Sequence, residues 1–179
     1  MKTAAALRSL MLAPLLGTAL FTVTGALAVG PALAAEPAII YVTRHGERAG
    51  EMATDPDLTP QGQARARHLA TLLRTAGIAH IFSTATRRTR QTAQPLATGL
   101  ALEVQIYDPA QPGKLVDQVK GLKSNALVVG HSNTVPELVK QFGGKPVSPI
   151  GDMEYDRLYQ LIIAPDGTVT TVLLHSVAQ

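Results

Sequence analysis

Two histidines in this sequence directly follow apolar segments of strand length. His45 comes after residues 38–42, and His131 comes after residues 126–129. Each has a neighbouring glycine, which allows the backbone to turn sharply and to approach a ligand closely. If the two segments are neighbouring strands, both imidazoles reach the same crevice. There, a neutral ring can act as a nucleophile when its other nitrogen donates to a fixed acceptor.

A third polar segment follows another short apolar run, residues 81–83. It contains Arg87, Arg88 and Arg90 at the start of a predicted helix. The planar guanidinium group suits bidentate contact with phosphate, and the backbone N–H groups at a helix N-terminus also favour anions. Read alone, these arginines fit an ordinary solvated helix face. Together with the two histidines they indicate a site that handles phosphate.

The elements that position these residues alternate along the chain. Thr59 and Pro60 suit the N-cap and first position of a helix that ends by Gly77. Further helices are expected over 88–98, with Pro95 inside, and over 112–122 and 134–142. Strands are expected at 38–42, 81–83, 102–107 and 126–130, followed by a hairpin of 158–164 and 169–175. This order predicts a three-layer α/β/α sandwich with a largely parallel central sheet, in which ligands bind at the carboxyl ends of the strands.

Residues 1–34 are typical of a secretory signal peptide. Lys2 and Arg8 form a positively charged start, residues 10–29 carry no charge, and an Ala-Leu-Ala box ends at Ala34. We therefore predict cleavage after Ala34 or one residue later, a single domain over 35–179, and a periplasmic or secreted protein. An uncleaved membrane anchor is the alternative, because the apolar stretch is nearly long enough to span a bilayer. After cleavage no stable membrane insertion is expected.

Composition excludes several classes of protein. The 179 residues are 46% hydrophobic and 16% charged, which is typical of a folded chain and not of a disordered one. Loss of Lys2 and Arg8 lowers the formal charge from +3 to +1, so a nucleic-acid partner is not expected. Cysteine is absent, so no disulfide framework can form and the fold must depend on its core.

Four motifs together resemble those of the histidine phosphatase (phosphoglycerate-mutase-like) superfamily. Residues 44–47 (RHGE) resemble the first-histidine signature, and residues 130–132 (GHS) resemble the second. Residues 83–93 resemble the family's second arginine block, with Arg88 as the matching arginine, and residues 58–62 (LTPQG) resemble its L-T-x-x-G motif. The motifs occur in the family's order. On this resemblance the chain is identified as a small exported bacterial-type member.

The resemblance implies a mechanism without metal or cofactor. His45 would accept the phosphoryl group and form a phosphohistidine, which water then hydrolyses. Arginines would supply the positive charge that stabilises the transition state. The catalytic residues implied are His45, Arg44, Arg88 and His131, and the substrate-binding residues are Glu47 and Ser132. His68, His80 and His175 have no comparable setting and are expected to be structural.

The general acid that protonates the leaving group is not apparent. Many small bacterial members have a glutamate after the second arginine block, and this chain has no such segment; the phytase-like branch has an aspartate where this chain has Ser132. Asp108 and Glu47 remain as candidates, although Asp108 also suits an ordinary turn and Glu47 could pair with Arg48 or Arg88. A substrate with a good leaving group, such as phosphohistidine or an acyl phosphate, needs no acid.

The leading hypothesis is therefore an exported phosphatase acting on a small phosphorylated substrate or a phosphorylated envelope component. The mature chain has little room for the lid of a phosphoglycerate mutase, so hydrolysis is favoured over mutase-type phosphotransfer. A non-catalytic module that binds a phosphoryl ligand is the other alternative, suggested by the missing acid. A binding module, however, has no need of a nucleophile at His45.

Overall fold

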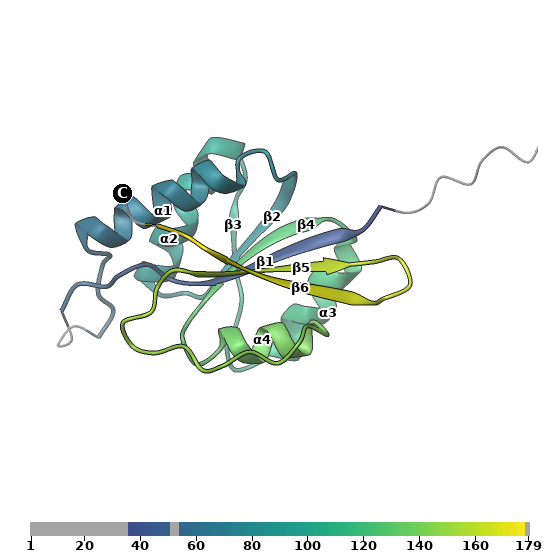
Figure 1. The fold of residues 1–179 in the computed structure, drawn as a ribbon. Helices are drawn as coiled ribbons and strands as arrows, with labels where there is room; N and C mark the ends of the chain where they lie inside the picture. The colour runs from purple at the N-terminus through teal and green to yellow at the C-terminus, as the bar shows by residue number, and fades with distance from the viewer. Residues whose placement is uncertain (1–35, 51–53, 178–179) are drawn as a thin grey trace, which may run out of the picture. The chain divides into compact units, whose positions relative to one another are not determined.

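A mixed six-stranded sheet with helices on both faces forms the part of the chain that the computed structural model describes, residues 36–50 and 54–177 (Figure 1). The strands are β1 (Ala38–Arg44), β2 (Ile78–Ser83), β3 (Val104–Ile106), β4 (Asn125–Gly130), β5 (Arg157–Ile163) and β6 (Val169–His175). The helices are α1 (Pro60–Leu73), α2 (Arg87–Leu100), α3 (Pro112–Leu122) and α4 (Val135–Gln141). The strand order is β3-β2-β4-β1-β5-β6, with parallel pairing from β3 to β1 and antiparallel pairing of β5 and β6. The predicted three-layer fold with a largely parallel sheet is confirmed.

Both faces of the sheet are buried, which explains why its central strands are apolar throughout. Successive side chains of a strand point to opposite faces. Ile40 and Val42 of β1 therefore pack against α3 and α4, whereas Tyr41 packs against α1 and α2. Figure 1 shows the same division, with α1 and α2 on one side of the sheet and α3 and α4 on the other.

The register of β1 and β4 brings the two histidines together. Arg44 of β1 pairs with Gly130 of β4 in the parallel ladder, so the two strands end side by side at the same edge of the sheet. The His45 backbone N–H then donates to the Gly130 carbonyl oxygen at 3.0 Å. On the other side of β4, Ser83 at the end of β2 pairs with Val129. Thr84, which follows β2, therefore lies at the same edge of the sheet. The carboxyl ends of three neighbouring strands therefore build one site.

The expected elements differ from the observed ones mainly in length. The third strand was expected over 102–107 and covers only Val104–Ile106, because it lies at the edge of the sheet and pairs with β2 alone. Helix α2 continues through Pro95 to Leu100 and is not shortened there. It ends where Ala101 adopts a left-handed conformation, with a φ of 53°.

The L-T-x-x-G segment attaches α1 to the loop that follows β1. Thr59 caps the helix by accepting a hydrogen bond from Gly62 N at 3.1 Å, and its own backbone N–H donates to the Glu47 carbonyl oxygen at 2.8 Å. The backbone of Gly62 lies so close to this loop that a Cβ atom there would stand 2.3 Å from the Glu47 carbonyl oxygen. The glycine is therefore required for the loop that carries His45 to pack on α1.

Gly62→Ala is expected to destabilise the fold by about 1–3 kcal/mol, the usual cost of forcing an extra carbon into a packed site. It should also lower kcat, because relief of the clash displaces the loop between β1 and α1. Denaturant unfolding and turnover of p-nitrophenyl phosphate measure the two effects. Gly99→Ala is the matched control: a Cβ atom there meets nothing within 4 Å, so stability should stay the same or rise by up to about 1 kcal/mol. Equal effects of the two substitutions would contradict this role of Gly62.

The predicted signal peptide, residues 1–34, and its cleavage point after Ala34 lie outside the described residues. Within the described residues, no helix is both long and apolar enough to cross a membrane.

Candidate active site

His45 has a buried imidazole ring, and one of its two nitrogens is hydrogen-bonded to the backbone. Its side chain follows the end of β1, and the residue is only 3% exposed. Nδ1 lies 2.7 Å from the Gly46 carbonyl oxygen, an acceptor, so Nδ1 carries the proton and Nε2 keeps its lone pair. Burial, together with the nearby positive charges of Arg44 and Arg88, lowers the His45 pKa to about 3. At neutral pH this side chain is therefore a neutral ring with a free nucleophilic nitrogen.

His131 faces His45 from the end of β4. The two ring centroids lie 5.4 Å apart in an edge-on arrangement. His131 Nε2 lies 3.0 Å from the Thr84 hydroxyl oxygen, and its Nδ1 lies 3.5 Å from Arg88 Nη2, which can only donate. The proton of the neutral ring is thus on Nε2. Burial and the charges of Arg88 and Arg44 lower the His131 pKa to about 4.

Arg44 is held from behind by a segment far along the chain. Its Nη1 atom donates to the carbonyl oxygens of Gly151, Asp152 and Glu154 at 2.8–2.9 Å. The ring of Tyr155 covers the guanidinium group, 4.1 Å from its central carbon, which is a cation–π contact. With Nη1 fully engaged, the rest of the guanidinium group remains to bind an oxyanion.

Arg88 completes a cluster of donors around the histidines. It lies in the first turn of α2, and its Nη1 atom is 3.5 Å from the Asp55 carboxylate. The Nε atoms of Arg44 and Arg88 are both buried without a hydrogen-bond partner among the described residues. Buried donors normally have an acceptor. Two unpaired guanidinium N–H groups beside a neutral imidazole are therefore suited to bind the oxygens of a phosphoryl group.

Thr92 links this helix to the loop of the first histidine. Its hydroxyl donates to the Arg88 carbonyl oxygen at 2.8 Å and accepts from the Gly46 backbone N–H at 2.9 Å. The four side chains expected to be catalytic, His45, Arg44, Arg88 and His131, are thus brought to one edge of the sheet. The contact of Tyr155 with Arg44 and the hydrogen bond between Thr84 and His131 were not predicted from the sequence.

The Glu47 carboxylate lies near Arg44 but is already paired with another arginine. The carboxylate forms a bidentate ion pair with Arg65 of α1, in which Arg65 Nη2 lies 2.6 Å from Glu47 Oε1. The prediction that Glu47 pairs with Arg48 or Arg88 is wrong. Burial raises the Glu47 pKa, but the Arg65 hydrogen bonds outweigh burial and leave it below its usual value. An ionised, paired carboxylate cannot serve as the general acid.

Asp108 is a turn residue and not the missing acid. Its carboxylate is fully exposed and accepts hydrogen bonds from Ala110 N at 2.9 Å and Gln111 Nε2 at 2.8 Å. These bonds lower its pKa, so it carries no proton to donate at neutral pH. Ser132 lies half-buried beside His131, and no hydrogen bond of its hydroxyl is seen among the described residues.

No cluster of three or more histidines or acidic residues that could hold a metal ion occurs within 36–50 and 54–177. Positive charge at the site comes from arginine side chains.

The lowered histidine pKa values predict how activity and stability depend on pH. In the folded protein His45 stays neutral down to about pH 3, so the acid limb of the kcat/KM profile should lie near pH 3–4. Unfolding exposes both rings, which then bind protons below their usual pKa of about 6.5. Because the unfolded chain binds more protons, stability should fall as the pH drops below 6.5. Turnover and circular dichroism, measured together from about pH 3 to 8, separate the two effects; an acid limb at pH 6.5 in fully folded protein would contradict the assignment.

Comparison with known proteins agrees with this geometry. Residues 40–109 match the model of the histidine phosphatase superfamily (branch 1). "Probable phosphoglycerate mutase GpmB" of Serratia proteamaculans (strain 568) is 27% identical over 155 residues, which cover 78% of this chain and 70% of that protein.

Solved structures of histidine phosphatases share the fold. The protein histidine phosphatase SixA complexed with tungstate superposes with a TM-score of 0.62 and 20% identity, covering 77% of this chain and 96% of that one. A mycobacterial glucosyl-3-phosphoglycerate phosphatase has a TM-score of 0.62 and 14% identity, covering 79% and 99% of the two chains. Residues 40–109 are therefore similar in sequence to the histidine phosphatase superfamily, and the fold of this chain is the one that these phosphatases have.

Proposed function

We propose that this protein is a phosphatase that hydrolyses its substrate through a phosphohistidine intermediate on His45. The observation that carries the proposal is the buried neutral ring of His45, with Nδ1 bound to the Gly46 carbonyl oxygen and Nε2 left free. A structural histidine has no need of a free nitrogen facing two arginines.

The proposed reaction has two displacements at phosphorus. His45 Nε2 attacks in line, a bond forms between nitrogen and phosphorus, and the bond to the leaving group breaks with its electron pair. Arg44 and Arg88 bind the equatorial oxygens, where negative charge gathers in the transition state, and His131 orients Arg88 through its Nδ1 atom. Water then attacks the phosphohistidine, releases inorganic phosphate and restores the neutral ring.

The leaving group suggests the class of substrate. Neither Glu47 nor Asp108 is placed or protonated to act as a general acid. Phosphohistidine that is protonated on its second ring nitrogen loses a neutral imidazole, and an acyl phosphate loses a carboxylate, so neither substrate needs a general acid from the protein. We therefore place phosphoramidates, such as phosphohistidine, ahead of sugar phosphates.

The two alternatives rest on weaker observations. Mutase-type phosphotransfer is suggested by the 27% identity to the GpmB protein. The carbonyl oxygens of Gly151, Asp152 and Glu154 hold Arg44, so this segment is not free to move as the lid of a mutase, and this favours hydrolysis. A binding module would leave the free nitrogen of His45 without a purpose.

The proposed setting is the periplasm or the exterior of the cell, and the proposed partner is a small phosphorylated substrate or a phosphorylated envelope component. Both proposals depend on the signal-like composition of residues 1–34.

A substrate panel in the presence of EDTA tests the proposed function. Phosphohistidine, acetyl phosphate and p-nitrophenyl phosphate should be hydrolysed, and glycerol phosphate should be hydrolysed more slowly by roughly 10²-fold or more, the usual contribution of general acid catalysis. Release of inorganic phosphate is the measurement. Loss of all activity with EDTA, restored by one divalent ion, would show that the site has been misread.

A further inference from the structure

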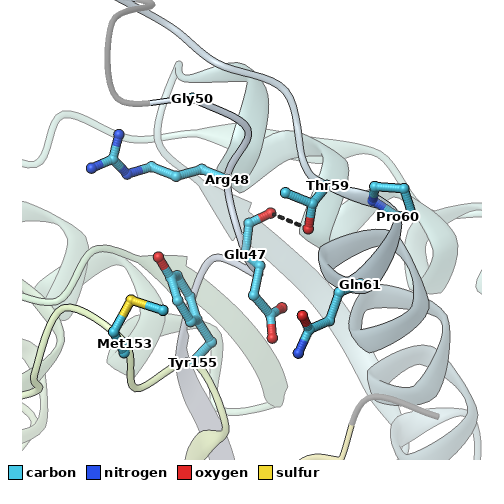
Figure 2. A pocket seen from close by; sticks show the side chains of 8 residues that line it. All are labelled: Glu47, Arg48, Gly50, Thr59, Pro60, Gln61, Met153 and Tyr155. Carbon is cyan, nitrogen blue, oxygen red and sulfur yellow. Dashed lines mark hydrogen bonds between the residues drawn. The ribbon is translucent and has the colours of Figure 1, made fainter.

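An open cavity is lined by the residues that follow the proposed nucleophile in the chain, Glu47 and Arg48, and by Tyr155. Its volume is about 530 Å³, which is within the range of small-molecule sites. Figure 2 shows its walls: Tyr155 and Met153 on one side, the start of α1 on the other, and Glu47 between them. Arg48 extends along the upper edge, above Tyr155 and Met153.

Tyr155 joins this cavity to the phosphate site. Its ring centroid lies 6.0 Å from that of His45, and the same ring covers the Arg44 guanidinium group at 4.1 Å. A phosphoryl group held between His45 and Arg44 therefore has the cavity at its side. The rest of the substrate has to occupy this space.

The charges of the cavity are not balanced among the described residues. Glu47 is neutralised by its ion pair with Arg65. Arg48 has no ion pair or side-chain hydrogen bond with any residue of 36–50 or 54–177, and its charge helps burial to lower the pKa of the neighbouring Arg44. The backbone of Arg48 is fixed by an antiparallel bridge to Leu58, so its side chain starts from a defined point.

The wall of the cavity below Arg48 in Figure 2 is apolar. Tyr155 presents an aromatic ring, and Met153 is 87% exposed, an unusual state for a large apolar side chain. A flat or apolar group can stack here while its far end meets Arg48.

We propose that this cavity holds the leaving group, and that Arg48 selects leaving groups carrying a second negative charge, a carboxylate or a further phosphate, on a flat or apolar body. This inference rests on the proposed function for the position of the phosphoryl group. It concerns selection among substrates, whereas the chemistry at phosphorus belongs to His45.

A pair of non-hydrolysable ligands tests the selection without requiring turnover. 4-Carboxyphenylphosphonate and 4-carbamoylphenylphosphonate have nearly the same shape and differ by one charge. Calorimetry should show that the full-length protein binds the carboxylate more tightly. Arg48→Gln should reduce this preference by roughly three- to tenfold, as expected for a partly exposed ion pair. Arg48→Lys should retain most of it.

Arg74→Gln is the matched control, because it removes one charge at the far end of α1 and should leave the preference unchanged. The inference is overturned if the native protein binds both ligands equally or binds neither. It is also overturned if Arg48→Gln, folded by circular dichroism, keeps the native preference. Failure of the proposed function appears separately, as lack of turnover of p-nitrophenyl phosphate by a protein that still shows the preference.

Discussion

His45→Ala is expected to lower kcat for p-nitrophenyl phosphate by at least about 10³-fold, because the step that it removes is the attack on phosphorus. Affinity for phosphate or vanadate should fall far less, since Arg44 and Arg88 remain. Steady-state kinetics and competition by vanadate measure the two quantities.

His68→Ala is the control for this experiment. His68 lies in the second half of α1, and its loss should leave kcat within about twofold. The mechanism would be refuted by a His45→Ala protein with native turnover. Equal losses of turnover and of vanadate affinity would instead show that His45 binds the anion and does not attack it.

Arg44→Lys is expected to lower kcat by roughly 10²-fold although it preserves the positive charge. A lysine ammonium has no planar fork, so it cannot reach the three carbonyl oxygens of the 151–154 segment and hold an oxyanion at the same time. The stacking on Tyr155 is also lost. Turnover of p-nitrophenyl phosphate, compared with that of the native protein, measures the effect.

The corresponding control is Arg74→Lys at the end of α1, which should behave as the native protein. If Arg44→Lys turns over p-nitrophenyl phosphate at the native rate, charge alone is sufficient and the geometry of the guanidinium group is irrelevant.

The positions of the two histidines could be predicted from the sequence because they depend on local pattern. Continuous apolar runs before His45 and His131 predict strands buried on both faces, and such strands pair in parallel at the centre of a sheet. Once Arg44 and Gly130 share a register, the following histidines must meet. Thr59 and Pro60 marked the start of α1 for the same reason, since capping is a matter of neighbouring residues.

The missed contacts have no local signal. Tyr155 and the carbonyl oxygens that hold Arg44 lie in a segment with no periodic pattern, more than a hundred residues away from Arg44 in the chain. The pairing of Glu47 with Arg65 depends on where α1 packs, which the loop sequence does not encode. Asp108 looked chemically useful because it follows a strand. However, its side chain satisfies the turn that it begins.

The support of Arg44 by the 151–155 segment ties anion affinity to the least regular part of the described fold. Residues 144–156 form neither helix nor strand, whereas His45 and His131 stand on the two central strands. Segments with few backbone ladders open with a smaller free energy than the global unfolding of a sheet. The hydrogen bonds between Arg44 and this segment can therefore break in a molecule whose histidines are still in place. Molecules in this locally open state keep the nucleophile but bind the substrate more weakly. Evolution of this loop can accordingly adjust KM while leaving the central strands, and the thermal stability that they provide, unchanged.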